Sequence, residues 1–311
     1  MAIDSSVLKL LLWSKNLGVK FDRTATLGRM GFPCSPGQVQ KDFDEFGFSV
    51  SREKFEQCFA REVFQDVYAD GLIRALGASD YVSIDRSNFE GATFIHDLND
   101  PFPEAMRNRF DFVLDGGTLE HVFNFPAALR HSMELVRVGG HFMTVPPANG
   151  QMGHGFYQVS PELYFSALSP QNGFVIRKIV IYECYQSETR FYEVQSPTRI
   201  GGRVELGSSP PATLAVLAQR ISDASIFAQP PQQSDYVAAW KEVEDTPKPV
   251  EQTGTGHRLR LALNPYIPHW VRRVKRKFKL EIFAKHDPPG LANTRFFRPL
   301  TNAEITSERQ K

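Results

Sequence analysis

The segment Phe110–Asn124, with the sequence FDFVLDGGTLEHVFN, constrains the fold more than any other part of the chain. It opens with Phe110 to Leu114, a run rich in residues that favour a buried strand. The run ends at Asp115-Gly116-Gly117, where two glycines allow backbone angles that other residues avoid. Thr118 and Glu120 then stand where a helix has its cap and its first-turn acid, so the pattern predicts strand, turn and helix. In an open α/β sheet such a corner lies at the carboxyl end of a strand, where these folds bind ligands.

The composition indicates an ordinary globular protein. Of the 311 residues 41% are hydrophobic and 23% charged, and the net charge is +1, so no nucleic-acid partner is expected from the overall charge. The three cysteines, Cys34, Cys58 and Cys184, lie far apart and show no metal-ligand spacing, which favours free thiols in a reducing compartment. The apolar run Val7–Trp13 is too short to span a bilayer, so we expect a cytoplasmic protein.

Strand patterns alternate with helical patterns along most of the chain. We expect a helix near the amino terminus over 7–13, an ordered loop or insertion from Met30 to about Ser51, and further helices over 52–77, 118–137 and 160–168. The expected strands are 23–28, 81–85, 92–97, 110–114, 141–145, 174–182 and 212–221. This order predicts a Rossmann-like α/β fold, with a mostly parallel seven-stranded sheet, helices on both faces and an antiparallel last strand pair.

The same patterns divide the chain into four parts. Residues 1–20 hold the amino-terminal helix, 21–228 the α/β domain, 229–256 a linker that is partly disordered, and 257–311 a basic C-terminal extension.

Two acids stand where consecutive predicted strands end. Asp85 ends the predicted strand 81–85, and Asp97 ends the next predicted strand, 92–97. A sheet that binds an adenosine needs a carboxylate that accepts both ribose hydroxyls and a polar group beside the adenine edge. Each aspartate could equally be a solvated residue that forms a turn.

Four segments together resemble the class I S-adenosylmethionine-dependent methyltransferases. They are Ser83–Asp85, His96–Leu98, Phe110–Val122 and Leu135–Phe142, and the resemblance covers roughly Phe21 to Phe227. It implies S-adenosylmethionine as cofactor and methyl transfer as the reaction, and we expect a small-molecule or glycan-type acceptor. The cofactor-binding residues that it implies are Gly28 in the first loop, Asp85 at the ribose, Asp97 and Leu98 at the adenine, Asp115 and Gly116 in the fourth-strand turn, and Glu120 and His121 after it.

The first loop departs from the family's pattern. The family has several glycines there, which let the backbone approach the methionine part of the cofactor. This chain has Gly28 followed by Arg29, and 57 residues separate Gly28 from Asp85, against roughly 20 in a compact dinucleotide unit. The departure motivates an alternative, in which a methyltransferase-fold protein acts without catalysis as a binding or scaffold subunit.

Methyl transfer depends mainly on orienting the acceptor, although a hydroxyl or amine acceptor can also need a base. His154 and Tyr157 follow the fifth strand on the ligand side and are the candidate catalytic residues. His154 could instead bond a loop carbonyl, and His121 could contact either the cofactor or a helix neighbour. We expect no metal site.

A basic amphipathic helix is predicted over 267–280, with a tryptophan on its apolar face. Such a helix can lie on an anionic membrane as a peripheral contact. It could equally bind phosphates or acidic helices of its own domain, or dock on the core with a solvated basic face.

Overall fold

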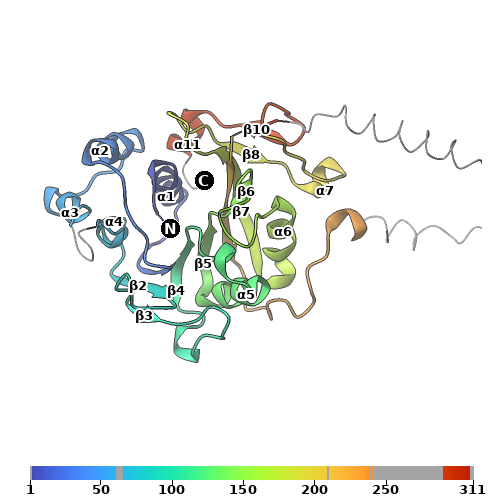
Figure 1. The fold of residues 1–311 in the computed structure, drawn as a ribbon, viewed down its shortest axis with the longest axis horizontal. Coiled ribbons are helices and arrows are strands. Elements are labelled where there is room, and N and C mark those ends of the chain that lie inside the picture. The colour runs from blue at the N-terminus through green and yellow to red at the C-terminus, as the bar shows by residue number, and fades with distance from the viewer. Residues whose placement is uncertain (1, 61–65, 209, 238–239, 241–289, 309–311) are drawn as a thin grey trace, which may run out of the picture.

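The computed structural model describes residues 2–60, 66–208, 210–237, 240 and 290–308 (Figure 1). Within these residues ten strands form one sheet, in the order β10-β8-β7-β9-β5-β4-β1-β2-β3, with β6 paired to β9. The strands are β1 (Arg23–Leu27), β2 (Asp80–Asp85), β3 (Phe94–Ile95), β4 (Phe110–Asp115), β5 (Val136–Thr144), β6 (Pro147–Asn149), β7 (Phe174–Glu183), β8 (Tyr192–Val194), β9 (Ala212–Arg220) and β10 (Phe297–Pro299).

The prediction of a mostly parallel Rossmann-like sheet is confirmed. Strands β3, β2, β1, β4 and β5 run parallel, and β9 and β7 form the antiparallel pair beyond them. The chain leaves β1 toward β2 and β3 and then returns to place β4 on the other side of β1. Ligands bind at such a reversal in open α/β sheets, outside the carboxyl ends of the strands. Strands β6, β8 and β10 were not predicted, because three residues are too few to show an alternating pattern.

Helices cover both faces of the sheet (Figure 1). The side chains of Phe112 and Leu114 join one apolar cluster with α1, α2 and α4, whereas Val113 joins the other with α5 and α6. This alternation along β4 explains why the whole strand is buried. The helices are α1 (Ser5–Asn16), α2 (Pro36–Glu45), α3 (Arg52–Gln57), α4 (Asp70–Ala75), α5 (Phe125–Leu135), α6 (Pro161–Ala167), α7 (Pro197–Ile200) and α11 (Asn302–Ser307), and the short 3-10 turns are η2 (Glu104–Met106), η3 (Leu119–His121) and η4 (Pro170–Asn172).

The single helix predicted over 52–77 is wrong. The chain forms α3 and α4 instead, and between them Val67 and Ala69 bond to the loop after β1. The amide of Phe32 donates to the carbonyl of Val67 at 2.7 Å, and the amide of Ala69 donates to the carbonyl of Met30 at 2.9 Å. These extended bonds cannot coexist with a continuous helix. The expected loop over 30–51 also contains α2, whose N-cap is Ser35 with Pro36 in the first turn.

The helix predicted over 118–137 is also shorter than expected. Asp115, rather than Thr118, caps the turn, because its Oδ1 accepts the amides of Thr118 and Leu119. The hydroxyl of Thr118 donates to the carbonyl of Leu27 at 2.5 Å and so joins β1 to the corner. The chain then makes the single turn η3 before α5 begins at Phe125.

The last described residues belong to the sheet and its helical layer. β10 pairs with β8, and α11 lies against α1, where the indole of Trp13 donates to Glu308 at 3.2 Å. The expected separate extension from 257 therefore does not reach the end of the chain, because Phe297 and Ile305 are buried in the main core. The basic segment 267–280 lies outside the described residues, as does the linker from 241. No helix in the described part of the chain is long and apolar enough to cross a membrane.

Candidate functional site

A cavity of about 320 Å³ opens at the carboxyl ends of β2 and β3, beside the turn that follows β4. Its position matches the reversal in strand order that α/β sheets use for ligands. The lining residues come from four separate parts of the chain: Ile84, Asp85, Arg86, His96, Asp97, Leu98, Asn99, Thr118, His121, Val122, Phe123 and Phe156. Four of the predicted cofactor-binding residues therefore share one cavity, namely Asp85, Asp97, Leu98 and His121.

Both strand-end acids line the cavity and also form turns. Oδ1 of Asp85 accepts the amide of Ser87 at 3.2 Å, and no described residue bonds its Oδ2. Oδ1 of Asp97 accepts two bonds from Asn99, and Arg86 lies 3.1 Å from its Oδ2. The bonds from Asn99 hold the pKa of Asp97 below its ordinary value. Asp85 is thus the acid with an oxygen available to a ligand, and Asp97 is largely satisfied by its own loop.

The wall of the cavity that Leu98 forms is apolar, and His131 contacts the backbone behind it. Leu98 is buried, and the ring of His131 lies 3.1 Å from its carbonyl oxygen. Two aromatic rings, Phe123 and Phe156, stand at the rim with 76% and 66% of their surface exposed and their centroids 5.9 Å apart. Sequence reasoning missed both rings. The available signal was the presence of large aromatic residues in loops that are otherwise polar.

The first loop is filled by its own side chains. Gly28 has φ +81°, and its amide donates to Ile84 at 2.6 Å, so it makes the turn off β1. Arg29 is buried, lies 3.2 Å from Asp70 and stacks on the ring of Tyr68. Met30 is fully buried, and a Cβ atom added at Gly116 would lie 2.8 Å from its Sδ. Gly116, which the resemblance implies as a cofactor-binding residue, therefore accommodates the side chain of Met30.

Two buried acids belong to the turn that follows β4, and they differ in their hydrogen bonds. Asp115 is fully buried, and the hydroxyl of Thr144 donates to its Oδ2 at 2.7 Å, while backbone amides occupy its Oδ1. Glu120 is also fully buried, yet neither of its carboxylate oxygens has a hydrogen-bond partner in the described part of the chain. Burial and the neighbouring Asp115 raise the pKa of Glu120 to about 8.

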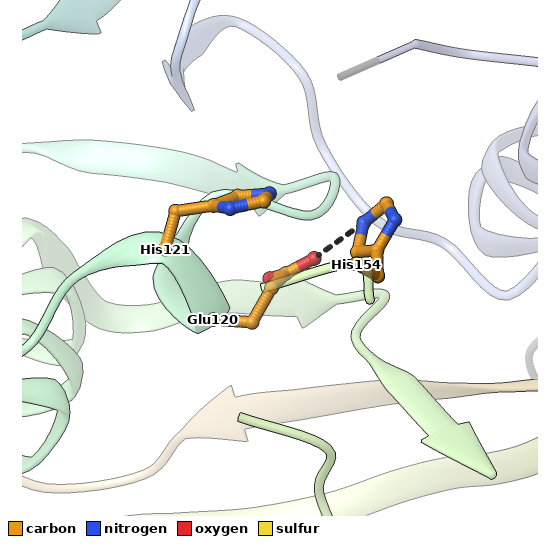
Figure 2. Close-up of side chains that lie close together, drawn as sticks. All are labelled: Glu120, His121 and His154. Atoms are coloured by element: carbon orange, nitrogen blue, oxygen red, sulfur yellow. Dashed lines mark ion pairs between the residues drawn. The ribbon is translucent and has the colours of Figure 1, made fainter. Parts of the chain in front are cut away.

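The two predicted catalytic residues have different surroundings. Figure 2 shows the ring of His154 turned toward Glu120, with its Nε2 3.3 Å from Oε1. The distance between the two atoms is that of an ion pair. Their geometry is not that of a hydrogen bond, because Oε1 has no hydrogen-bond partner among the described residues. The ring of His121 lies 5.3 Å from that of His154, centroid to centroid, and burial and His154 lower the pKa of His121. Tyr157 donates its hydroxyl to the carbonyl of Phe123 at 2.6 Å, so this hydroxyl anchors a loop.

The residues present fit the nucleoside part of S-adenosylmethionine. Asp85 offers a carboxylate oxygen to which no described residue bonds, and Leu98 offers an apolar wall in the same cavity. Met30 and Gly116 do not line this cavity, and Met30 fills the space over Gly116, so a methionine part could approach Gly116 only if the Met30 side chain moved. Met has three rotatable bonds and is the apolar side chain that rearranges most readily.

No protein-family model matches the chain, and neither does any curated protein. Solved structures that overlap with it include an S-adenosylmethionine-dependent methyltransferase from Archaeoglobus fulgidus, at 12% identity and a TM-score of 0.34, over 69% of this chain and 94% of that one. Another such methyltransferase, from Thermotoga maritima, overlaps at 12% identity and a TM-score of 0.32, over 69% and 92%. A branched-chain polyamine synthase from Thermus thermophilus overlaps at 10% identity and a TM-score of 0.35, over 73% and 60%.

All three scores lie below 0.5, and all three identities below 25%. What this chain binds therefore has to be argued from its own residues. The chain is similar to S-adenosylmethionine-dependent methyltransferases in its overall arrangement, and that arrangement is the Rossmann-like sheet described above.

Proposed function

We propose that the protein is an S-adenosylmethionine-dependent methyltransferase that acts on a hydroxylated small molecule or glycan-type acceptor. The observation that carries the proposal is the cavity at the strand reversal, where Asp85, Leu98 and His121 come together from three chain segments. A carboxylate at the end of the second strand suits two ribose hydroxyls, and an apolar wall beside the next strand suits a purine.

The cofactor would supply an electrophilic methyl group, and the chain would supply position and proton transfer. Asp85 would hold the nucleoside, and the exposed rings of Phe123 and Phe156 would cover the mouth of the cavity. The candidate for taking the proton of an acceptor hydroxyl is His154, which is 48% exposed beside Glu120. Tyr157 does not share this role in the proposal, because its hydroxyl bonds the carbonyl of Phe123.

One observation favours a second function. Met30 fills the space over Gly116, and Arg29 pairs with Asp70, so side chains of the first loop occupy the space beside the turn after β4. A protein with this loop could bind a nucleoside without a methionine group. It would then act as a binding subunit rather than an enzyme.

Calorimetric titration of the purified full chain separates the two functions. The ligands are S-adenosylmethionine, S-adenosylhomocysteine and adenosine. Binding of all three supports the methyltransferase. Binding of adenosine alone supports the binding subunit, and no heat with any ligand at millimolar concentration contradicts both.

The two matched variants each replace one aspartate, at opposite ends of β2. Asp85→Asn removes the charge at the cavity, and affinity for S-adenosylhomocysteine should fall about 10- to 100-fold, since a hydrogen bond to a charged group contributes about 1.5–3 kcal/mol. Asp80→Asn is the control, because Asp80 lies at the opposite end of β2 and pairs with Arg109 at 2.7 Å. Equal affinity in both variants would show that the cavity does not hold the ribose.

A further inference from the structure

Three potential metal ligands lie close together at the edge of the cavity that His121 lines (Figure 2). They are Glu120 and His121, which are consecutive residues of η3, and His154 from the loop after β6. One ligand atom from each lies within 4.8 Å of the others. The spacing in the sequence gave no sign of this group, because 33 residues separate His121 from His154.

The carboxylate of Glu120 lacks the partners that a buried acid normally has. It is fully buried, and neither oxygen has a hydrogen bond from the described residues. Its neighbour Asp115 shows the contrast, because amides and the hydroxyl of Thr144 satisfy both of its oxygens. A buried polar group without partners indicates a missing water or ion, since leaving it unpaired costs about 1–3 kcal/mol or more.

We propose that Glu120, His121 and His154 bind one divalent transition-metal cation. Two imidazole nitrogens and one carboxylate oxygen form a donor set that suits Zn²⁺ and the related first-row cations. Three protein ligands leave at least one coordination position open, which is the arrangement of catalytic rather than structural zinc sites. The cation would give the buried carboxylate of Glu120 a partner of opposite charge.

One backbone bond joins the loop that carries His154 to η3, and a second bond closes the loop on itself. The amide of Phe156 donates to the carbonyl of Glu120 at 2.9 Å, and the amide of Gln151 donates to Oε1 of Gln158 at 2.8 Å. Gly155 is required for this approach, since a Cβ atom there would lie 3.0 Å from the carbonyl oxygen of Glu120 and 3.2 Å from Nδ1 of His121. The three ligands are thus positioned by the backbone before a cation arrives.

The site also gives the cation a task that rests on the proposed function. His121 lines the cavity, so an open coordination position beside it could receive a hydroxyl of the acceptor. With the cation bound, His154 is a ligand and no longer acts as the base: the cation would lower the pKa of the coordinated hydroxyl, which would release its proton to solvent water near neutral pH. The substrate class would then be an alcohol with a hydroxyl or vicinal hydroxyls free to coordinate, as in a glycan.

The direct test measures metal binding without any methyl donor. Full-length protein, free of tags and stripped with chelator, is titrated with Zn²⁺ by calorimetry and with Co²⁺ by visible absorption. His257, His269 and His286 lie outside the described residues, so the titrations use a background in which all three are alanine. We expect one high-affinity equivalent and a Co²⁺ spectrum with d–d bands.

Three single changes identify the ligands. His154→Ala alters an exposed side chain, Glu120→Gln keeps the shape of a buried one, and His121→Ala removes the third donor; each should weaken Zn²⁺ binding at least tenfold. His141→Gln, in β5 and outside the cluster, is the control and should bind as the background does. Circular dichroism confirms that each variant is folded.

The substitution His121→Ala distinguishes a metal site with three ligands from a simple ion pair between Glu120 and His154. An ion pair does not need His121, so Zn²⁺ binding that is unaffected by His121→Ala would overturn the proposed ligand set. A background protein that binds no equivalent would overturn the site itself. Neither result depends on S-adenosylmethionine binding, which the calorimetry with Asp85→Asn tests separately.

Discussion

At the scale of single residues, the side chain of Met30 fills the space over Gly116, in the turn that follows β4. Its Sδ and Cε would lie 2.8 and 2.9 Å from a Cβ atom at Gly116. The glycine after β4 is therefore explained by a neighbour in the same chain. The resemblance predicted Gly116 as a cofactor contact, and the position can serve that purpose only after Met30 has moved.

A double-mutant cycle tests this contact. Gly116→Ala should destabilise the protein by about 1–3 kcal/mol, because the added methyl group overpacks a site that is already filled. The same change made in a Met30→Ala background should cost much less, since the alanine leaves room for the methyl group. Equal costs in the two backgrounds, measured by denaturant unfolding, would show that Met30 does not occupy the space over Gly116.

Met30→Ala should also change ligand preference. Removing the thioether opens the methionine end of the site, so affinity for S-adenosylhomocysteine should rise relative to adenosine. The variant itself should lose about 2–5 kcal/mol of stability, as fully buried Met residues do when truncated. Calorimetry with both ligands measures the ratio, and an unchanged ratio would mean that Met30 does not restrict this end.

A third residue-scale prediction concerns pH. Burial, with Arg177 and Arg137 nearby, lowers the pKa of His141 to about 4. The unfolded chain therefore binds this proton more readily than the folded protein, so the contribution of His141 to stability is complete above pH ~6.5 and falls as the pH drops toward 4. Between pH 7 and 5 the loss should be about 2 kcal/mol. His141→Gln should remove that part of the slope in denaturant midpoints, and an identical slope would contradict the assignment.

At the scale of elements, the sequence predicted the strands of the parallel sheet and missed what holds the short pieces around it. β4 was predicted at its observed residues because a buried strand between a charged loop and a Gly-Gly turn has a clear pattern. The helix over 52–77 was wrong because bonds from Phe32 and Ala69 to distant residues override a local helical period. Long-range pairing of this kind has no local pattern to reveal it.

The candidate site divides in the same way. Asp85, Asp97, Leu98 and His121 were predicted from strand ends, and the structure brings them to one cavity. The group of Glu120, His121 and His154 was not predicted, because it depends on how the loop after β6 folds back over η3. Phe123 and Phe156 were missed for the same reason.

The strand β10 offers a prediction at this scale. Phe297 is fully buried, although it follows a long segment outside the described residues, and its neighbour Arg298 is exposed beside Glu193. Phe297→Ala should cost about 3–5 kcal/mol and Arg298→Ala at most about 1 kcal/mol, as expected for a core aromatic and for a surface ion pair. Similar unfolding midpoints for the two variants would show that this strand does not contribute to the core.

At the scale of the whole molecule, the last described residues return to the amino-terminal helix. Lys178 and Trp13 both contact Glu308, so α1, β7 and the end of the chain support one another. A truncation from His257 would remove this support together with the basic segment. An internal deletion of 257–286 keeps β10 and α11 and is the better probe of that segment.

We propose, from the sequence alone, that the basic segment 267–280 makes peripheral contact with anionic membranes. The full chain should then float with phosphatidylserine-containing liposomes, and the chain without 257–286 should not. High salt should reduce flotation of the full chain, because the attraction is partly electrostatic. Equal flotation of the two proteins would contradict a membrane role for this segment.

The central claim is that the cavity at the ends of β2 and β3 receives the nucleoside of S-adenosylmethionine, and a crystal structure grown with saturating S-adenosylhomocysteine tests it most directly. The account predicts ribose hydroxyls at Asp85, the purine against Leu98, and the Met30 side chain displaced from Gly116. Ligand density at another place, or a cavity still empty at saturating ligand, would contradict it.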